Sequence, residues 1–130
     1  MTRKMRDVVS GIFLVQGRFL VEKRRMEEDA DPSLVAIPGG HVEIGESIEA
    51  ALKREMKEEL GLEVKEARLV GEELYTASNG ERQRIHYFVI EKWEGKPKSH
   101  EAEQIYWESK LDNLSTPQDK RILRKHVLDR

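Results

Sequence analysis

Residues 40–62 read GHVEIGESIEAALKREMKEELGL and contain the most informative element of the chain. Ser47 can cap the start of a helix with its hydroxyl, and Gly61 stands where the left-handed residue that ends a helix is expected. Between them, four apolar residues recur every four positions: Ile48, Leu52, Met56 and Leu60. This spacing predicts an amphipathic helix whose apolar stripe packs on a sheet.

Three acidic residues of this helix, Glu55, Glu58 and Glu59, follow i, i+3, i+4 spacing, so their side chains converge beside the stripe. Like charges at this spacing cost about 0.2–0.5 kcal/mol per pair in an isolated helix, which calls for a compensating cation. Carboxylates without histidine or thiolate suit hard ions such as Mg²⁺ or Mn²⁺, and Mg²⁺ is usually shared with substrate phosphates. The pattern therefore favours a polyphosphate ligand. Taken alone, it also fits a solvated Glu-rich helix.

The same stretch resembles the signature of the Nudix hydrolases, G-x5-E-x7-R-E-U-x-E-E-x-G-U, in which U is a bulky aliphatic residue. Every specified position matches, through Gly40, Glu46, Arg54, Glu55, Met56, Glu58, Glu59, Gly61 and Leu62. The segment EKWEGKP at 91–97 and Trp107 are also similar to the MutT-type branch, which hydrolyses nucleoside triphosphates. The resemblance implies an α/β fold, the Nudix α/β/α sandwich with a mixed β-sheet flanked by helices, over a single domain at 1–130.

The resemblance also implies a metal centre and a reaction. In relatives, the residues matching Glu55, Glu58 and Glu59 hold a divalent cation together with a backbone carbonyl at the position of Gly39. The expected cofactor is Mg²⁺, for which Mn²⁺ can substitute. Water attacks a phosphorus atom and releases a nucleoside monophosphate and pyrophosphate. Glu55, Glu58 and Glu101 all remain candidates for the general base.

Further roles follow from the same resemblance. Arg54 is expected to pair with the glutamates of the signature and fix their rotamers, and Glu46 to brace the loop before the helix. Arg25 is expected on the phosphates, with a solvated strand-end arginine as the alternative, and Ile37 is expected as a wall of the base pocket. Gln118 stands where MutT-type enzymes have an asparagine that contacts the purine edge. This departure leaves specificity for an oxidised base, as in 8-oxo-dGTP, open.

Outward from the helix, short apolar runs bounded by turn residues predict strands. The expected elements are strands at 8–15, 18–23, 34–37, 68–76, 83–93 and 104–107 and a closing helix at 118–128. Gln16-Gly17 is expected to form a hairpin turn, Pro38-Gly39-Gly40 to end a strand, and Ser78-Asn79-Gly80 to join two strands. This order predicts a mixed sheet with helices on its faces.

Composition excludes several classes of protein. The chain has 130 residues, of which 38% are hydrophobic and 37% charged, and no apolar run is long enough to span a membrane. A net charge of −2 gives no general attraction to nucleic acid, so no stable nucleic-acid partner is expected. The absence of cysteine excludes disulfides and thiolate chemistry and fits a reducing compartment. We expect a cytoplasmic protein with a small-molecule nucleotide substrate. Its oligomeric state is open.

Two other functions remain in view. The first is the same chemistry on another nucleoside diphosphate derivative, such as ADP-ribose or a dinucleotide polyphosphate. No proline occurs between Pro38 and Pro97, which counts against the ADP-ribose branch, and Tyr75 lies only roughly where the dinucleotide branch expects a tyrosine. The second is a non-catalytic nucleotide sensor. Such proteins generally lose signature glutamates or the arginine, all of which are present here.

Overall fold

The computed structural model describes residues 4–128, and its central helix, α1, spans Ile48–Leu60. Ser47 caps the helix by accepting a hydrogen bond from the backbone N–H of Ala50 at 3.1 Å. Gly61 adopts a left-handed φ of 70° and donates its N–H to the carbonyl of Lys57, which ends the helix. The predicted stripe is buried at Leu52, Met56 and Leu60 and half-buried at Ile48. Both ends of the predicted helix and its packing face are therefore confirmed.

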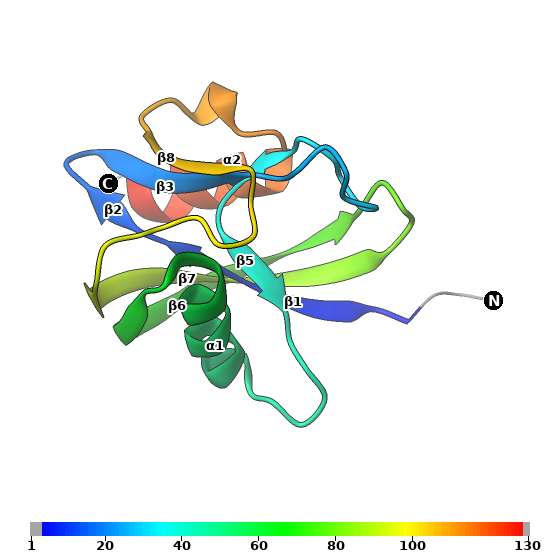
Figure 1. Ribbon diagram of the computed structural model, residues 1–130, viewed down its shortest axis with the longest axis horizontal. Helices are drawn as coiled ribbons and strands as arrows, with labels where there is room; N and C mark the ends of the chain where they lie inside the picture. The colour runs from blue at the N-terminus through cyan, green and yellow to red at the C-terminus, as the bar shows by residue number, and fades with distance from the viewer. Residues whose placement is uncertain (1–3, 129–130) are drawn as a thin grey trace.

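The first sheet is mixed and has the strand order β5-β1-β7-β6 (Figure 1). Its strands are β5 (Gly39–His41), β1 (Arg6–Ile12), β7 (Arg82–Glu94) and β6 (Glu63–Thr76). Strand β1 runs antiparallel to β5 and parallel to β7, and β6 and β7 form a long antiparallel hairpin. Strands β1 and β7 are parallel neighbours, and parallel neighbours need a long crossover connection. The chain that connects them includes α1, which lies on one face of the sheet.

The second sheet is antiparallel and is centred on β3 (Arg18–Lys23). Strand β8 (Gln104–Glu108) pairs with most of one side of β3, while β2 (Leu14–Val15) and β4 (Val35–Ala36) share the other side. A 3₁₀ turn, Leu111–Asn113, follows β8. Leu20 of β3 packs in one cluster with Leu52 and Met56, so this sheet lies close to the signature helix.

Two hydrophobic cores lie on opposite faces of the first sheet. Val8 and Ile12 of β1 pack in one cluster with the buried side of α2 (Pro117–Leu123), and Val9 and Phe13 pack in the other with α1. Figure 1 shows α1 and α2 on either side of the sheet. Burial on both faces explains why the run from Val8 is apolar without alternation. The predicted α/β class, a mixed sheet flanked by helices, is confirmed.

Two predictions near the signature differ from the structure. The expected strand 8–15 is divided, because β1 ends at Ile12 and the chain then crosses to the second sheet as β2. The hairpin at Gln16-Gly17 is confirmed, with positive φ at both residues, and it joins β2 to β3. Pro38-Gly39-Gly40 does not simply end a strand, since Gly39–His41 forms β5. A Cβ atom at Gly39 would collide with the carbonyl of Val9, so this glycine permits a close strand approach.

The C-terminal half of the chain follows the prediction more closely. The hairpin of β6 and β7 is confirmed, although β6 begins at Glu63 instead of Arg68. Strand β8 is confirmed, and the closing helix begins at Pro117 with Thr116 as its cap. Beyond Leu123 this helix continues as a π-helical turn, Arg124–Leu128. Among residues 4–128, no helix has the length and apolar character needed to cross a bilayer.

Candidate active site

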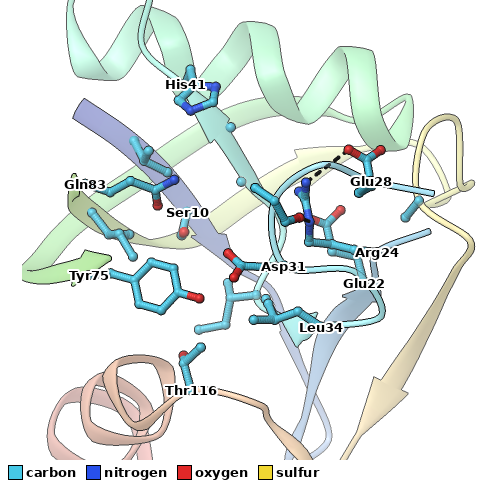
Figure 2. Close-up of a pocket in the computed structure, with 18 of the residues that line it drawn as sticks. Ser10, Glu22, Arg24, Glu28, Asp31, Leu34, His41, Tyr75, Gln83 and Thr116 are labelled. Atoms are coloured by element: carbon cyan, nitrogen blue, oxygen red, sulfur yellow. Dashed lines mark hydrogen bonds and ion pairs between the residues drawn. The ribbon is translucent and has the colours of Figure 1, made fainter. Parts of the chain in front are cut away.

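A cavity of about 370 Å³ is lined by both sheets, by α1 and by the loop that follows β3. This volume lies in the usual range for small-molecule sites. One part of the cavity is acidic and carries four carboxylates, Glu22, Glu55, Glu59 and Glu101. Another part is less charged and includes Leu34, Ile37, Tyr75, Thr116 and Asp119. Figure 2 shows Tyr75 and Thr116 on one side and Glu22 and Arg24 on the other.

Arg54 ties together the loop and the helix that make up the signature. Its Nε and Nη2 atoms donate to the two carboxylate oxygens of Glu46 at 2.7 and 2.9 Å. Its Nη1 atom donates to Glu55 at 2.9 Å and to Glu58 at 3.1 Å, and Nη2 also reaches the carbonyl of His41 at 2.9 Å. These bonds lower the pKa of Glu46 to about 2. The arginine thus fixes the orientation of three glutamates of the signature.

The three glutamates predicted to hold a cation are placed differently around the cavity. Glu55 and Glu59 line it, whereas the Glu58 side chain is 52% exposed and is held by Arg54. Within residues 4–128, no three acidic or histidine side chains are already grouped around one point as a metal site. The reason is local. Arg54 hydrogen-bonds to Glu55 and Glu58, and the carboxyl group of Glu59 contacts another carboxyl group.

Glu55 lies directly against the backbone of β5. A Cβ atom at Gly40 would overlap the Glu55 carboxylate, so glycine at this position is what allows the side chain to lie there. Burial raises the pKa of Glu55, and the hydrogen bond from Arg54 opposes that shift. The contact is with Gly40, the residue after Gly39, whose carbonyl was the predicted backbone ligand.

Glu59 faces a residue that the sequence analysis did not select. Glu22 of β3 is 8% exposed, and its carboxyl group hydrogen-bonds to that of Glu59 and accepts from the N–H of Gly39. Oε2 of Glu59 is buried and has no hydrogen-bond partner. Burial raises the pKa of both carboxyl groups. The charge and hydrogen bond of Glu22 raise the pKa of Glu59 further, whereas the hydrogen bond with Glu59 opposes the shift of Glu22. The acidic part of the cavity therefore contains more carboxyl groups than the described residues around it can keep ionised.

Two arginines follow β3 and line the same cavity. Arg25 donates from Nε to the carbonyl of Glu101 at 2.7 Å, which brings the predicted phosphate ligand next to a candidate base. Arg24, which the sequence analysis passed over, donates to the carbonyl of Ala30 at 3.0 Å and to Glu28 at 3.1 Å. Cationic groups thus border the acidic end, as an anionic ligand bound there would require.

The less charged part of the cavity is organised by Asp119 of α2. Its Oδ2 atom accepts from the backbone N–H of Ile37 at 3.1 Å, and its Oδ1 atom accepts from the Tyr87 hydroxyl at 2.6 Å. Burial raises the pKa of Asp119 to about 6. Ile37 lines the cavity at the place predicted for a wall of the base pocket. A ligand in this part of the cavity would meet a fixed carboxyl group.

Gln118, the residue predicted to contact the base, lies outside this cavity. Its side-chain amide donates to the carbonyl of Leu74 at 3.0 Å, and the residue lines a second, separate hollow together with Thr76 and Pro117. Its neighbour Asp119 occupies the inward-facing position instead. The one-residue difference follows from the turn of α2, because successive residues of a helix point about 100° apart.

A loop closes over the less charged part of the cavity. The backbone N–H of Asp31 donates to the hydroxyl of Ser78 at 2.7 Å, and the N–H of Ser78 donates to the Asp31 carboxylate at 2.8 Å. This reciprocal pair fastens the loop between β3 and β4 to the turn between β6 and β7. Tyr75 and Asp31, which both line the cavity, point toward one another (Figure 2).

Signals for two of the overlooked residues exist in the sequence. Glu22 is a single acid within the apolar run FLVE of a predicted strand, and a lone charge on a buried strand is a marker of function. Asp119 follows Thr116-Pro117, a helix start, and lies in the first turn. Neither signal says which way the side chain points. That depends on strand register and on how α2 docks.

We expect the cation-free protein to lose stability as the pH rises from about 4.5 to about 7. A carboxyl group whose pKa is raised by folding binds more protons in the folded state, so the free energy of unfolding falls as the pH rises between the two pKa values. This window runs from 3.8 to about 6 for Asp119 and from 4.5 to about 7 for Glu22. The lowered pKa of Glu46 affects the free energy of unfolding only below this range, between about 2 and 4.5.

Thermal unfolding in a metal chelator, followed by circular dichroism across that range, measures the trend. Each pKa unit corresponds to about 1.4 kcal/mol, so the summed effect is large enough to resolve. A midpoint temperature that climbs steadily with pH would contradict the raised pKa values of these buried acids.

Comparison with known sequences agrees with the signature. A sequence model described as the NUDIX domain matches residues 4–129. The chain is 34% identical over 119 residues to the CTP pyrophosphohydrolase of Escherichia coli K12, covering 88% of this chain and 83% of that protein. It is 31% identical over 112 residues to an 8-oxo-dGTP diphosphatase of Haemophilus influenzae, covering 82% of this chain and 78% of that protein.

Comparison of structures gives the same result. The crystal structure of a MutT NUDIX hydrolase from Burkholderia pseudomallei superposes with a TM-score of 0.81. The two sequences are 26% identical, and the match covers 96% of this chain and 100% of that one. The arrangement of sheets and helices is therefore shared over nearly the whole of both chains.

Proposed function

The chain belongs to the Nudix family of hydrolases, and on that premise we propose that it hydrolyses a nucleoside or deoxynucleoside triphosphate to the monophosphate and pyrophosphate. The observation that supports the proposal is that two parts of one cavity are lined by different kinds of residue. Carboxylates and arginines surround one part, as a polyphosphate with its cation requires, and a fixed polar group with apolar neighbours lines the other, as a base requires. We further propose that the enzyme acts in the cytoplasm.

The acidic part of the cavity fits a divalent cation, which Nudix hydrolases generally use. Oε2 of Glu59 is buried without a partner, and the available donors are all oxygen atoms, the ligand type that hard cations prefer. We assign the ligands to Glu55, Glu58, Glu59 and the carbonyl of Gly39, and Mg²⁺ as the cation, with Mn²⁺ as a substitute. Glu58 is exposed and can leave Arg54 to join them.

The cation, when bound, neutralises charge on the phosphates and lowers the pKa of a bound water. The remaining work falls to side chains of this chain. Arg25 and Arg24 bind the phosphates from the loop after β3, opposite the glutamates of α1. Arg54 holds Glu55 and Glu58 in position through its hydrogen bonds. The proton of the attacking water passes to Glu55, Glu58 or Glu101, each of which lies at or beside the acidic part of the cavity.

We propose that the base binds in the less charged part, against Ile37 and within reach of Asp119. Each oxygen of Asp119 already accepts one hydrogen bond, but a carboxylate oxygen has a second lone pair to offer. An ionised Asp119 therefore favours a base edge with an amino group over that of uracil, whose single N–H lies between two carbonyl oxygens that repel a carboxylate. The relatives named above act, by their names, on CTP and on 8-oxo-dGTP, and both bases carry an amino group. In this role Asp119 replaces Gln118.

The test is product analysis on a panel of nucleotides with Mg²⁺. The panel contains CTP, dGTP, 8-oxo-dGTP, UTP, ADP-ribose and a diadenosine polyphosphate, and the assay separates monophosphate plus pyrophosphate from diphosphate plus phosphate. We expect pyrophosphate release and a higher kcat/KM for triphosphates whose base carries an amino group than for UTP. Turnover of ADP-ribose or the dinucleotide alone would refute the assigned substrate class. Tight nucleotide binding without turnover would instead indicate a sensor.

Replacement of Arg25 with alanine should raise KM for the preferred triphosphate by about 10-fold and change kcat much less. A charge-assisted hydrogen bond to phosphate is worth about 1.5–3 kcal/mol, and an arginine that contacts the phosphates equally in the ground and transition states affects binding alone. Arg18→Ala is the matched control, because Arg18 is exposed on β3 and does not line the cavity. An unchanged KM would assign Arg25 to the solvated surface.

A further inference from the structure

Glu22 is a buried acid in an unusual setting. It follows three buried apolar residues on β3, Phe19, Leu20 and Val21, and is itself only 8% exposed. The other strongly buried acid outside α1, Asp119, accepts hydrogen bonds from a hydroxyl and an amide. Glu22 has one such donor, the N–H of Gly39, and its second neighbour is the carboxyl group of Glu59. One buried acid thus faces another.

The charge of Arg24, two residues further along, offsets only part of the burial of Glu22 and leaves its pKa raised. The guanidinium group of Arg24 hydrogen-bonds to the carbonyl of Ala30 and to Glu28. Oε2 of Glu59 remains buried without a partner on the other side. Burial of a charged group without compensation is costly, and an apolar residue at position 22 would serve the strand equally well. The arrangement is explained if a cation joins the two carboxylates.

The position of Glu22 suits that role. Its partner Glu59 and the residue that donates to it, Gly39, are both members of the proposed cation site. Glu22 reaches the site from β3 of the second sheet, opposite α1, whereas the signature glutamates all come from the helix side. We propose that Glu22 is a further ligand of the divalent cation, supplied by β3. This inference rests on the proposed function, because it presumes that the cation binds at Glu59.

Binding of Mn²⁺ to the full-length protein tests the inference without any substrate. The electron paramagnetic resonance signal of free aqueous Mn²⁺ gives the bound fraction, and hence Kd, for the wild type and for Glu22→Gln. Glutamine preserves the shape of the side chain and can donate its amide to Glu59, so the thermal midpoint of the cation-free variant should equal or exceed that of the wild type. We expect Kd for Mn²⁺ to rise by at least about 10-fold.

Two further variants make the result specific. Glu103→Gln removes an exposed acid that pairs with Lys23 and does not line the cavity, and its Kd should match the wild type. Glu22→Asp keeps the charge but withdraws it by one methylene, and it should bind Mn²⁺ more tightly than Glu22→Gln. These three results together would establish Glu22 as a ligand.

The outcomes that overturn the inference differ from those that overturn the proposed function. If the wild type binds Mn²⁺ and Glu22→Gln binds it within about twofold of the same Kd, Glu22 is a partner of Glu59 in a carboxyl pair and no ligand. In that case the cation-dependent hydrolase stands. If the wild type itself binds no Mn²⁺ and hydrolyses no nucleotide, the proposed function fails and this inference fails with it.

Discussion

Glu55→Gln should lower kcat by about 10²–10⁴-fold while the protein remains folded. The Glu55 side chain lies against Gly40, accepts a hydrogen bond from Arg54 and lines the acidic part of the cavity. It is both an assigned cation ligand and a candidate general base, and a neutral amide is a weaker ligand and cannot accept the proton. Removal of one charge from a crowded acidic cluster also relieves repulsion, so the fold should not suffer. Steady-state release of pyrophosphate measures the change in kcat.

Glu49→Gln is the matched control, since Glu49 is exposed in the first turn of the same helix. It should leave kcat and the thermal midpoint unchanged. The pH dependence of the single variants Glu55→Gln, Glu58→Gln and Glu101→Gln then identifies the base, because loss of the base removes the acidic limb of the pH–rate profile. Turnover of Glu55→Gln at the wild-type rate would remove Glu55 from the site and leave the acidic part of the cavity without a proven use.

The parts of the molecule that could be predicted from sequence depend on local interactions. The capping of α1 by Ser47, its end at Gly61 and the buried stripe all arise from residues within one or two turns of each other. The signature is local in the same sense, because Arg54 and the glutamates that it binds lie within a loop and one helix. Such features follow from spacing, and spacing can be read from a sequence.

The parts that could not be predicted depend on which strands are neighbours. Glu22 meets Glu59 because β3 belongs to a second sheet that approaches α1, and nothing near residue 22 in the sequence indicates this. The division of the strand 8–15 between two sheets has the same origin. Asp119 and Gln118 are adjacent polar residues, and the sequence does not indicate which of them faces the cavity. The docking of α2 on β6 decides this. Tertiary packing, and not local sequence preference, determines where these side chains point.

Arg54→Lys should lower kcat by about 10–100-fold, although the positive charge is retained. The guanidinium group of Arg54 spans Glu46, Glu55 and Glu58 at the same time, with bonds of 2.7–3.1 Å. An ammonium group is a compact point charge and cannot reproduce the planar fork that holds both oxygens of Glu46. Glu55 and Glu58 would then occupy several rotamers, and the cation ligands would have to be ordered each time a cation binds.

The readout that separates this positioning role from a merely structural one is Kd for Mn²⁺ measured beside kcat and KM. Loss of order among the ligands should weaken Mn²⁺ binding and lower kcat, whereas KM at saturating cation should change little, because Arg54 does not line the substrate cavity. Lys53→Arg, the reverse exchange at the exposed neighbouring position, should change neither quantity. If Arg54→Lys lowered only the thermal midpoint and left Kd and kcat intact, the arginine would be a brace for the loop at Glu46. The catalytic glutamates would then have to be held in position by their own packing against β5 and β3.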